Sequence, residues 1–418
     1  MSRVTEQYDA FPYPERDPAD EKTRLITGSP SHPLEIDHYL FGGQRDWTEP
    51  FKALVAGGGT GDALIQLAQT LTSAGTPYEI TYVDLSESAR KIAEARAEAR
   101  GLTNITFLTQ SLLDAPDLGR FDYIDCCGVL HHLPEPQAGF DALAAALGPH
   151  GGLGLMVYAP FGRSGVYPLQ EAFGTLLTGS AKERLRRAKT IFERVPDGHP
   201  MKTNPHLRDH KVSDAGFYDL LLHSQDRAFR IGEVLDMLDR AGLQMTGSPQ
   251  ACFYDPLPIV GDPGLLRGMD ARDRMSLSEA LRGTIRTHVL YAAKDADLRL
   301  ARPTPNAIPH LKGVAGPKLA QVAAQRGVVP ITQDDTKTEI PVPGLAARAF
   351  AHVDGLRTLQ EIAQAARTDW ISFSPIWAGV SDALAAHGML YYSRIRRRFA
   401  RRVSTPSSPS AASGPAPA

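Results

Sequence analysis

The sequence predicts an α/β protein built on a doubly wound, mostly parallel sheet, with an N-terminal arm and a small C-terminal α+β module. Two observations predict the sheet. Five short apolar runs alternate with segments of helical periodicity, and a glycine-rich turn follows the first run. Strands that alternate with helices form a parallel sheet that is covered on both faces.

The elements follow the chain in order. The five apolar runs, expected as strands, span 52–57, 78–86, 104–110, 121–130 and 152–159. The helices expected between them span 62–75, 88–101 and 141–147. The second of these helices closes at Gly101, because glycine is favoured just past a helix end. Further on, 231–242 is expected as a helix, and 243–249 and 287–294 as two more strands.

Composition changes divide the chain into segments. We expect an arm at 1–50, a main domain at 51–296 with a cap inserted at about 160–228, a linker at 297–330, a module at 331–394 and a basic, then disordered tail at 395–418. In the module, Thr358 and Glu361 have the spacing of a capping box, which predicts a helix start.

The bulk composition is that of a soluble globular protein. Of 418 residues, 42% are hydrophobic, and the formal net charge of -2 gives no basic field for nucleic acid. The cysteines are Cys126, Cys127 and Cys252, and two adjacent cysteines do not suit a disulfide framework, so a cytoplasmic location is expected. The N-terminus lacks the apolar run of a signal peptide, and we expect no membrane contact.

The stretch LVAGGGTGDAL, residues 54–64, raises the question of what its glycines contact. A dinucleotide fingerprint needs a third glycine where this chain has Asp62 or Leu64. Asp62 would also place a negative charge at a helix start, where a pyrophosphate would have to lie. No GK[ST] follows, so a P-loop is excluded as well.

What remains is G-x-G-x-G, formed by Gly57, Gly59 and Gly61. It allows a cofactor without phosphates to touch the backbone. The next strand ends in Asp84, where a carboxylate can accept hydrogen bonds from both hydroxyls of a ribose. S-adenosylmethionine, a nucleoside with a cationic amino-acid tail, suits these groups. The alternative is a tight strand-to-helix turn without a ligand.

Here the sequence resembles the class I S-adenosylmethionine-dependent methyltransferases, which have a Rossmann-like fold. The segments that carry the resemblance are LVAGGGTG, YVDLS, ITFLTQSLLD, FDYIDCCGVLHHLPEP and LGPHGGLGLMVYA. It covers about residues 50–160 and extends more weakly to 295. It implies a seven-stranded sheet and S-adenosyl-L-methionine as cofactor. EQYDAFPYPER (6–16) and DLLLHSQDRAFRI (219–231) are similar to a bacterial methyltransferase group often fused to tetratricopeptide repeats, although this sequence shows no such repeat.

The resemblance also implies a set of cofactor contacts. Gly57, Gly59 and Gly61 would line the methionine and ribose, Asp84 would hold the ribose diol, Leu85 would flank the adenine, Ser111 and Leu112 would contact its amino edge, and Cys127, Gly128 and Val129 would lie near the sulfonium. Two positions depart from the family. The acid often found two residues before the first glycine is Val55 here, and the aspartate at the adenine edge is Ser111, with Asp114 nearby.

Three residues at strand ends are candidates for catalysis. His131 and His132 follow the fourth strand, beside the expected methyl group, where either could act as a general base. The alternative is that they shape the loop. Tyr158 ends the fifth strand and could orient an acceptor, or could simply be a packed aromatic residue.

Candidates for the substrate pocket come from the cap and the arm. His223 and Arg227 are four residues apart and would share a helical face, unless the segment is an ordinary amphipathic helix. The lid candidates are Tyr8, Tyr13, Tyr39 and Arg45, which belong to aromatic, turn-rich segments of the arm; the alternative is surface packing. No metal site is expected, because the histidines near 206–210 are read as a solvated loop.

The predicted function is methyl transfer to an unidentified small-molecule or peptide acceptor. The alternative is a non-catalytic protein that binds S-adenosylmethionine or S-adenosylhomocysteine, an idea favoured by Val55 and Ser111. A nicotinamide-dependent enzyme is a third reading, opposed by Asp62. Nucleic acid is disfavoured as a partner, since no NPPY-type motif is present. HVDGLRTLQEIAQAA (352–366) resembles a winged-helix-like module that would bind a protein partner or form a dimer contact.

Overall fold

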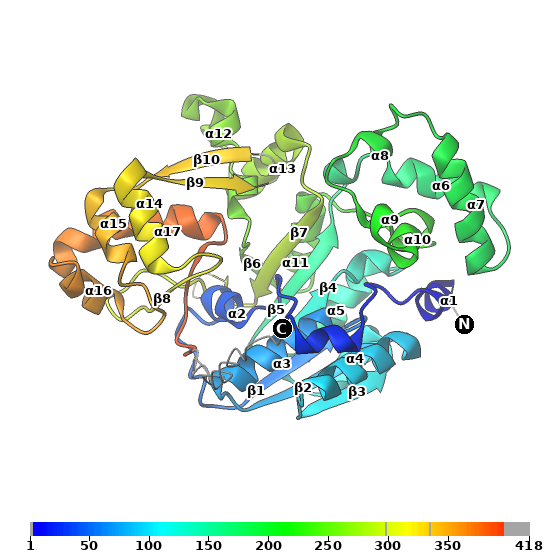
Figure 1. Cartoon of the computed structure of the whole chain (residues 1–418), viewed down its shortest axis with the longest axis horizontal. Helices are drawn as coiled ribbons and strands as arrows, with labels where there is room; N and C mark the ends of the chain where they lie inside the picture. The colour runs from blue at the N-terminus through cyan, green and yellow to red at the C-terminus, as the bar shows by residue number, and fades with distance from the viewer. Residues whose placement is uncertain (1–2, 297–298, 334–335, 397–418) are drawn as a thin grey trace, which may run out of the picture.

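The computed structural model describes residues 3–296, 299–333 and 336–396. The expected basic, disordered tail therefore lies outside the described residues from 397 onward. Figure 1 shows a central sheet with a group of helices on one side, the cap, and the C-terminal module of helices and short strands on the other. Among the described residues, every helix is too short or too polar to cross a membrane.

The central sheet has seven strands in the order β3-β2-β1-β4-β5-β7-β6. They are β1 (Phe51–Ala56), β2 (Tyr78–Asp84), β3 (Ile105–Thr109), β4 (Phe121–Cys127), β5 (Leu147–Tyr158), β6 (Gln244–Gly247) and β7 (Thr287–Ala293). The first five are parallel, and β7 is antiparallel to both β5 and β6. The predicted seven-stranded, mostly parallel sheet is confirmed.

Strand β5 begins at Leu147, before the GPHGG segment, whereas the sequence suggested a start at 152. Glycine explains how the strand passes this point. A Cβ atom on Gly151 would lie 2.5 Å from the carbonyl oxygen of Phe121, so only glycine allows this close approach to the start of β4. The pairing of β4 with β5 is irregular between Phe121 and Tyr123.

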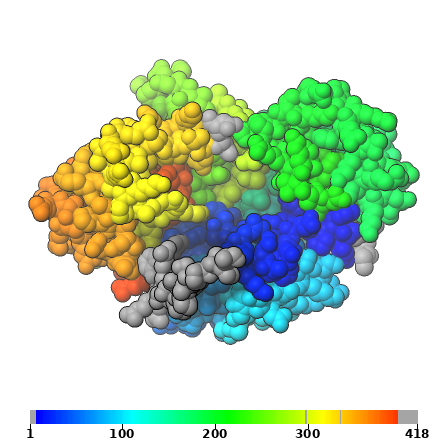
Figure 2. Space-filling model, viewed as in Figure 1, coloured from blue at the N-terminus to red at the C-terminus, as the bar shows by residue number. Residues whose placement is uncertain are grey.

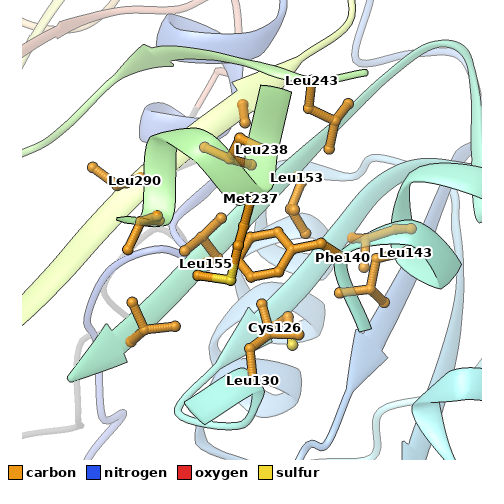
Figure 3. Packing of buried hydrophobic residues seen from close by; sticks show 14 of the residues in the cluster. Cys126, Leu130, Phe140, Leu143, Leu153, Leu155, Met237, Leu238, Leu243 and Leu290 are labelled. Atoms are coloured by element: carbon orange, nitrogen blue, oxygen red, sulfur yellow. The ribbon is translucent and has the colours of Figure 1, made fainter. Parts of the chain in front are cut away.

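Helices cover both faces of the sheet. On one face, α5 (Pro136–Ala146) and α11 (Ile231–Arg240) pack Phe140 and Met237 against leucines of β5, as Figure 3 shows. On the other face lie α2 (Pro33–Leu40), α3 (Asp62–Ala74) and α4 (Glu87–Ala99). Local signals fix the helix ends: the Ser86 hydroxyl caps α4, and Gly75 ends α3 in the left-handed conformation.

The segment after β5 forms the cap, which has a hydrophobic cluster of its own. Its helices are α6 (Val166–Leu176), α7 (Ala181–Arg194), α8 (Pro200–Thr203), α9 (Asp209–Val212) and α10 (Asp214–Leu222). Helix α1 (Arg3–Ala10) of the arm contacts both α4 and α7, so the arm bridges the sheet and the cap. Figure 2 shows the arm in dark blue between the green cap and the cyan edge of the sheet.

The C-terminal module also has its own core. It contains β8 (Pro309–Leu311), α14 (Gly316–Arg326), β9 (Val328–Gln333), β10 (Thr336–Pro341), α15 (Gly344–Phe350), α16 (Leu359–Ala365), α17 (Trp370–Ala386) and β11 (Leu390–Tyr392). The capping box of Thr358 and Glu361 at the start of α16 is present. The segment expected to be a linker contains β8 and α14. The prediction of a linker was wrong here, because β8 pairs with β11 and α14 packs into the module core.

The remaining elements complete the fold. They are α12 (Leu257–Val260), α13 (Ala271–Arg282) and the 3-10 turns η1 (Pro18–Lys22), η2 (Leu112–Leu118), η3 (Leu130–His132), η4 (Phe161–Arg163), η5 (Ala251–Tyr254) and η6 (Pro263–Leu266). Helix α2 connects the sheet with the module. Its buried Glu35 accepts hydrogen bonds from Tyr291 of β7 and Tyr391 of β11, and pairs with Lys312.

Candidate functional site

A cavity of about 540 Å³ lies where β1, β2, β4 and β5 end at their carboxyl edge. This edge is where open α/β sheets hold their ligands. The cavity is bordered by the glycine turn after β1, by the ends of β2 and β4, by the arm and by the cap. The cavity is therefore formed by three segments that are distant in sequence: the arm, the strand ends of the sheet and the cap.

Two glycines of the turn allow close approach to the backbone. Gly57 and Gly59 have φ angles of 74° and 52°, and both line the cavity. A Cβ atom on Gly57 would lie 2.4 Å from the Val129 side chain, so a larger residue would close this end of the cavity. Gly61 does not line the cavity. A Cβ atom there would lie 3.0 Å from Ala93, so this glycine lets α3 and α4 pack.

Asp84 stands at the end of β2 and faces the same space. One of its carboxylate oxygens accepts a hydrogen bond from the Gly59 amide at 2.8 Å, and the other accepts one from the Ser86 amide at 2.8 Å. Burial raises the pKa of Asp84 above its ordinary value. Each oxygen keeps a free lone pair, which leaves the carboxylate able to accept two further hydrogen bonds.

The remaining predicted cofactor residues line the cavity as well. They are Leu85, Ser111, Leu112, Cys127, Gly128 and Val129. Ser111 has a second task, since its hydroxyl caps η2 by accepting from the Leu113 amide. Burial raises the pKa of the Cys127 thiol, so this cysteine lines the cavity as a neutral thiol and does not act as a nucleophile.

The arm crosses over the glycine turn and is held there by ion pairs. The Thr60 hydroxyl donates to the Pro14 carbonyl oxygen at 2.6 Å, and Arg16 pairs with Asp62 at 2.6 Å. Asp62 also pairs with the buried Arg96 at 2.8 Å. Burial alone would raise the pKa of Asp62, but the two arginines outweigh it and hold the pKa below its ordinary value. This carboxylate is thus neutralised within the protein.

The far end of the cavity is lined by polar groups from the arm, β5 and the cap. Asp219 of α10 accepts hydrogen bonds from the Tyr8 hydroxyl at 3.2 Å and, more weakly, from the Tyr158 hydroxyl at 3.4 Å. Asp219 is 5% exposed, and among the described residues no lysine or arginine forms an ion pair with it. Burial, reinforced by the charge of Asp226, raises the pKa of Asp219 to about 7.

The two predicted histidines occupy different positions. His132 lines the cavity, and its Nδ1 lies 3.0 Å from the Gln225 carbonyl oxygen. His131 lies behind it, with its ring stacked on Tyr158 at a centroid distance of 3.9 Å. Burial lowers the pKa of both imidazoles, so both are neutral at physiological pH. His131 supports the Tyr158 ring and does not border the cavity.

Two side chains at this end were missed by the sequence reasoning. Asp219 is the first residue of the DLLLHSQDR segment, and nothing in the sequence marks it as buried. Arg163 of η4 lies 3.5 Å over the Tyr158 ring and pairs with the fully buried Asp226 at 3.2 Å. No sequence signal indicated this pair, because its partners are 63 positions apart.

Three residues predicted to line the pocket lie outside the cavity, because each is held by other contacts. Tyr39 is buried against Tyr291 on the sheet face covered by α2. Arg45 packs over the Phe51 ring at 4.7 Å. Arg227 is 63% exposed and pairs with Glu233. Of the other two, Tyr13 lines the cavity, and His223 lies just behind its wall, 3.2 Å from the Tyr8 hydroxyl.

Two groups of side chains are close enough to be considered as metal ligands: His131, His132 and Asp226, and His132, Asp219 and His223. The rings of His132 and His223 stack at 3.9 Å with an angle of 16° between their planes. A metal ion lies in the plane of each imidazole that binds it, about 2.1 Å from the nitrogen. Two nearly parallel rings at this spacing cannot both meet that condition, so the second group does not form a metal centre in this arrangement.

Comparison with known proteins identifies the domain around the glycine turn. Residues 54–153 match the family described as Methyltransferase domain. An uncharacterized protein of Synechococcus sp. is 30% identical over 271 residues, which are 63% of this chain and 64% of that protein. The chain thus spans just under two thirds of that relative. The ubiquinone biosynthesis O-methyltransferase of Coxiella burnetii is 39% identical over 75 residues, 18% of this chain and 32% of that enzyme.

Among solved structures, the chain resembles PKMT2 from Rickettsia typhi. The complex of that protein with AdoHcy has a TM-score of 0.59 at 16% identity, over 86% of this chain and 74% of PKMT2. A second structure of PKMT2 gives 0.61 at 16% identity, over 89% and 77%. At this identity the likeness shows a shared fold. The chain therefore shares the Rossmann-like methyltransferase fold, and its residues 54–153 match a methyltransferase domain.

Proposed function

We propose that the chain transfers the methyl group of S-adenosylmethionine to an amine of a small molecule or a peptide, bound at the Asp219 end of the cavity. The methyltransferase domain in residues 54–153 supports the cofactor. One observation supports the acceptor class: Asp219 is a buried carboxylate between tyrosine hydroxyls, beside the same cavity as the glycine turn.

The residues of the cavity fit the cofactor. A volume of about 540 Å³ is within the usual range for small-molecule sites. Gly57 and Gly59 expose backbone where the methionine and ribose would lie, and Asp84 would accept hydrogen bonds from the ribose hydroxyls. Leu85 and Leu112 supply apolar surface for the adenine ring.

The acceptor end complements a cation. Asp219 offers a negative charge, and the Tyr8 ring, which lines the same cavity, offers an aromatic surface to which an ammonium group is attracted. A buried carboxylate without a cation is unfavourable, so either a proton or a positively charged ligand must balance it. An amine that arrives as an ammonium ion supplies both the charge and the proton.

When bound, S-adenosylmethionine would supply an electrophilic methyl group: the nitrogen lone pair would form the new N–C bond, and the sulfur of S-adenosylhomocysteine would leave with the electron pair of the broken C–S bond. An ammonium ion has no free lone pair, so Asp219 must first accept one of its protons. A carboxylate whose pKa is about 7 can do so near neutral pH. Tyr8 and Tyr158 hold the carboxylate in place, and Arg163 and His131 hold the Tyr158 ring.

The test is formation of S-adenosylhomocysteine by the full chain with a panel of acceptors. Each amine, including lysine-containing peptides and diamines, is paired with the alcohol in which a hydroxyl replaces the amino group. We expect turnover with at least one amine and none with its matched alcohol. Turnover of the alcohols alone would contradict the amine assignment. Binding of S-adenosylmethionine without release of product from any acceptor would support a non-catalytic binding protein instead.

A further inference from the structure

A second buried carboxylate, besides Asp219, lines the cavity without a cation beside it among the described residues. Asp125 of β4 lines the cavity and is 1% exposed. Its carboxylate accepts hydrogen bonds from the hydroxyls of Ser31 and Tyr123, the latter at 3.2 Å. Within the described ranges, no lysine, arginine or histidine forms an ion pair with it. Asp125 is therefore a buried anion without a counter-ion from the protein.

The position of Asp125 in the sheet is informative. It is the β4 residue paired with Val55 of β1. Paired residues on neighbouring strands point to the same face, and Val55 shares the face and the hydrophobic cluster of Tyr123. Val55 is the position, two residues before Gly57, at which the resembling family often has an acid. In this chain the carboxylate is found one strand away, on the same face and at the same level.

The other carboxylates that line the cavity have different surroundings, and one of them, Asp209 at the start of α9, is exposed to solvent. Asp62 pairs with two arginines, and Asp84 is bound by the amides of Gly59 and Ser86 at the ribose end. Asp219 lies at the acceptor end, among the tyrosines. Asp125 lies two residues before Cys127, at the end where the methionine part of the cofactor would lie.

We propose that Asp125 binds the α-ammonium group of the cofactor's methionine part and replaces the acid that position 55 lacks. The proposal rests on the proposed function, because it requires that S-adenosylmethionine occupies the cavity. The ammonium group would provide the missing counter-ion. A carboxylate has about four lone-pair sites, so the hydrogen bonds from Ser31 and Tyr123 leave room for another donor.

Burial explains why this pair would matter. A carboxylate taken out of water is unstable unless a charge or a proton compensates it. Burial raises the pKa of Asp125 to about 6, despite the hydrogen bonds that lower it. A charge-assisted hydrogen bond to the ligand would stabilise the ionised form, and its loss corresponds to about a 10- to 100-fold change in affinity.

The test combines one substitution with one change in the ligand. Calorimetry measures binding of S-adenosylhomocysteine, and of its deamino analogue that lacks only the α-amino group, to the wild-type chain and to Asp125→Asn. We expect the wild type to bind S-adenosylhomocysteine about 10- to 100-fold more tightly than the analogue. In Asp125→Asn this preference should nearly vanish, because only the complete ligand loses a partner.

Controls separate the outcomes. Asp122→Asn removes a carboxylate of the same strand that bonds to Arg45 outside the cavity, and it should keep the wild-type preference. Binding of the analogue reports whether Asp125→Asn still forms the site. If Asp125→Asn does not fold, the wild type alone still tests the proposal. Equal affinity of the wild type for S-adenosylhomocysteine and for the deamino analogue overturns it. An equal loss of both ligands in Asp125→Asn overturns it too and leaves the proposed function intact. If the wild type binds neither ligand, the proposed function and this inference both fail.

Discussion

The hydroxyl of Tyr8 lies 3.2 Å from a carboxylate oxygen of Asp219, although 211 positions separate the two residues. The contact joins the arm to the cap directly over the cavity, and Phe11 extends it by stacking on Tyr218 at 5.1 Å. The Asp219 end of the cavity is thus complete only when the arm is in place. Binding of the acceptor and closure of the arm are therefore expected to be coupled.

The pH dependence of turnover should report the ionisation of Asp219. Its pKa is raised to about 7, and only the ionised form can accept a proton, so kcat should rise with pH and level off above about pH 7. Asp219→Asn should lower kcat by about 10²- to 10⁴-fold and remove this rise, while the affinity for S-adenosylmethionine stays close to that of the wild type. A variant that keeps the wild-type pH profile would exclude Asp219 as the base. The measurement is the steady-state rate from pH 5.5 to 9.

The same carboxylate should lower the stability of the chain at neutral pH. Its pKa in the folded state is about 7 and its ordinary value is 3.8, so the folded state binds more protons between these values. Stability from this group is therefore fully present below about pH 4 and is lost as the pH rises through about 7. Asp219→Asn should raise the melting temperature relative to the wild type, by more at pH 8 than at pH 5. A difference that does not change with pH would contradict this. Differential scanning fluorimetry without ligand measures it.

The pair of Arg16 and Asp62 should control release of the cofactor product. Their side chains are 24% and 29% exposed, and they hold the arm over the glycine turn. Arg16→Ala should increase the dissociation rate of S-adenosylhomocysteine by about 2- to 10-fold, because opening of the arm becomes easier. The control is Arg24→Ala, which breaks an exposed pair with Asp20 and should leave the rate unchanged. Stopped-flow displacement gives both rates, and equal rates would show that the arm is not a barrier to release.

The contact of Lys312 with Glu35 should stabilise the whole chain. Glu35 is fully buried between the sheet and the module, and Lys312 is the cation that pairs with it. Lys312→Met should reduce the free energy of unfolding by about 2 to 4 kcal/mol, since it leaves a buried charge uncompensated. Lys52→Met, which breaks an exposed pair with Glu79, should change it by less than about 1 kcal/mol. Urea denaturation compares the two, and equal effects would contradict the role of Glu35.

The sequence was sufficient for the parts of the fold that depend on local pattern. The strands of the sheet, the capping box of Thr358 and the glycine turn all have short-range signals, and each is present in the structure. Local pattern also placed Asp84 beside Gly59, because the carboxyl ends of neighbouring parallel strands meet at one edge. The expected linker failed for the opposite reason. The strand β8 is only three residues long and is stabilised by β11, which lies some 80 positions later.

The Asp219 end of the cavity could not be derived from the sequence because it depends on contacts between distant segments. Tyr39 and Arg45 were expected to line the pocket, since aromatic and basic residues in an arm look alike whether they face a ligand or a core. In the structure, Tyr39 stacks on Tyr291 on the sheet face that α2 covers, and Arg45 packs over the ring of Phe51. Asp219 of α10 lines the cavity instead and contacts Tyr158 at the end of β5, which no periodicity in the sequence indicates.

The most direct test of the account is calorimetric binding of S-adenosylmethionine to the full chain and to Asp84→Ala, with Asp114→Ala as the control. We predict micromolar binding by the wild type, about -8 kcal/mol, an unchanged value for Asp114→Ala, and a loss of at least about 100-fold for Asp84→Ala. That result would establish the cavity at the glycine turn as the cofactor site. Absence of binding by the wild type, or equal binding by the Asp84→Ala variant, would contradict the assignment of this cavity as the S-adenosylmethionine site.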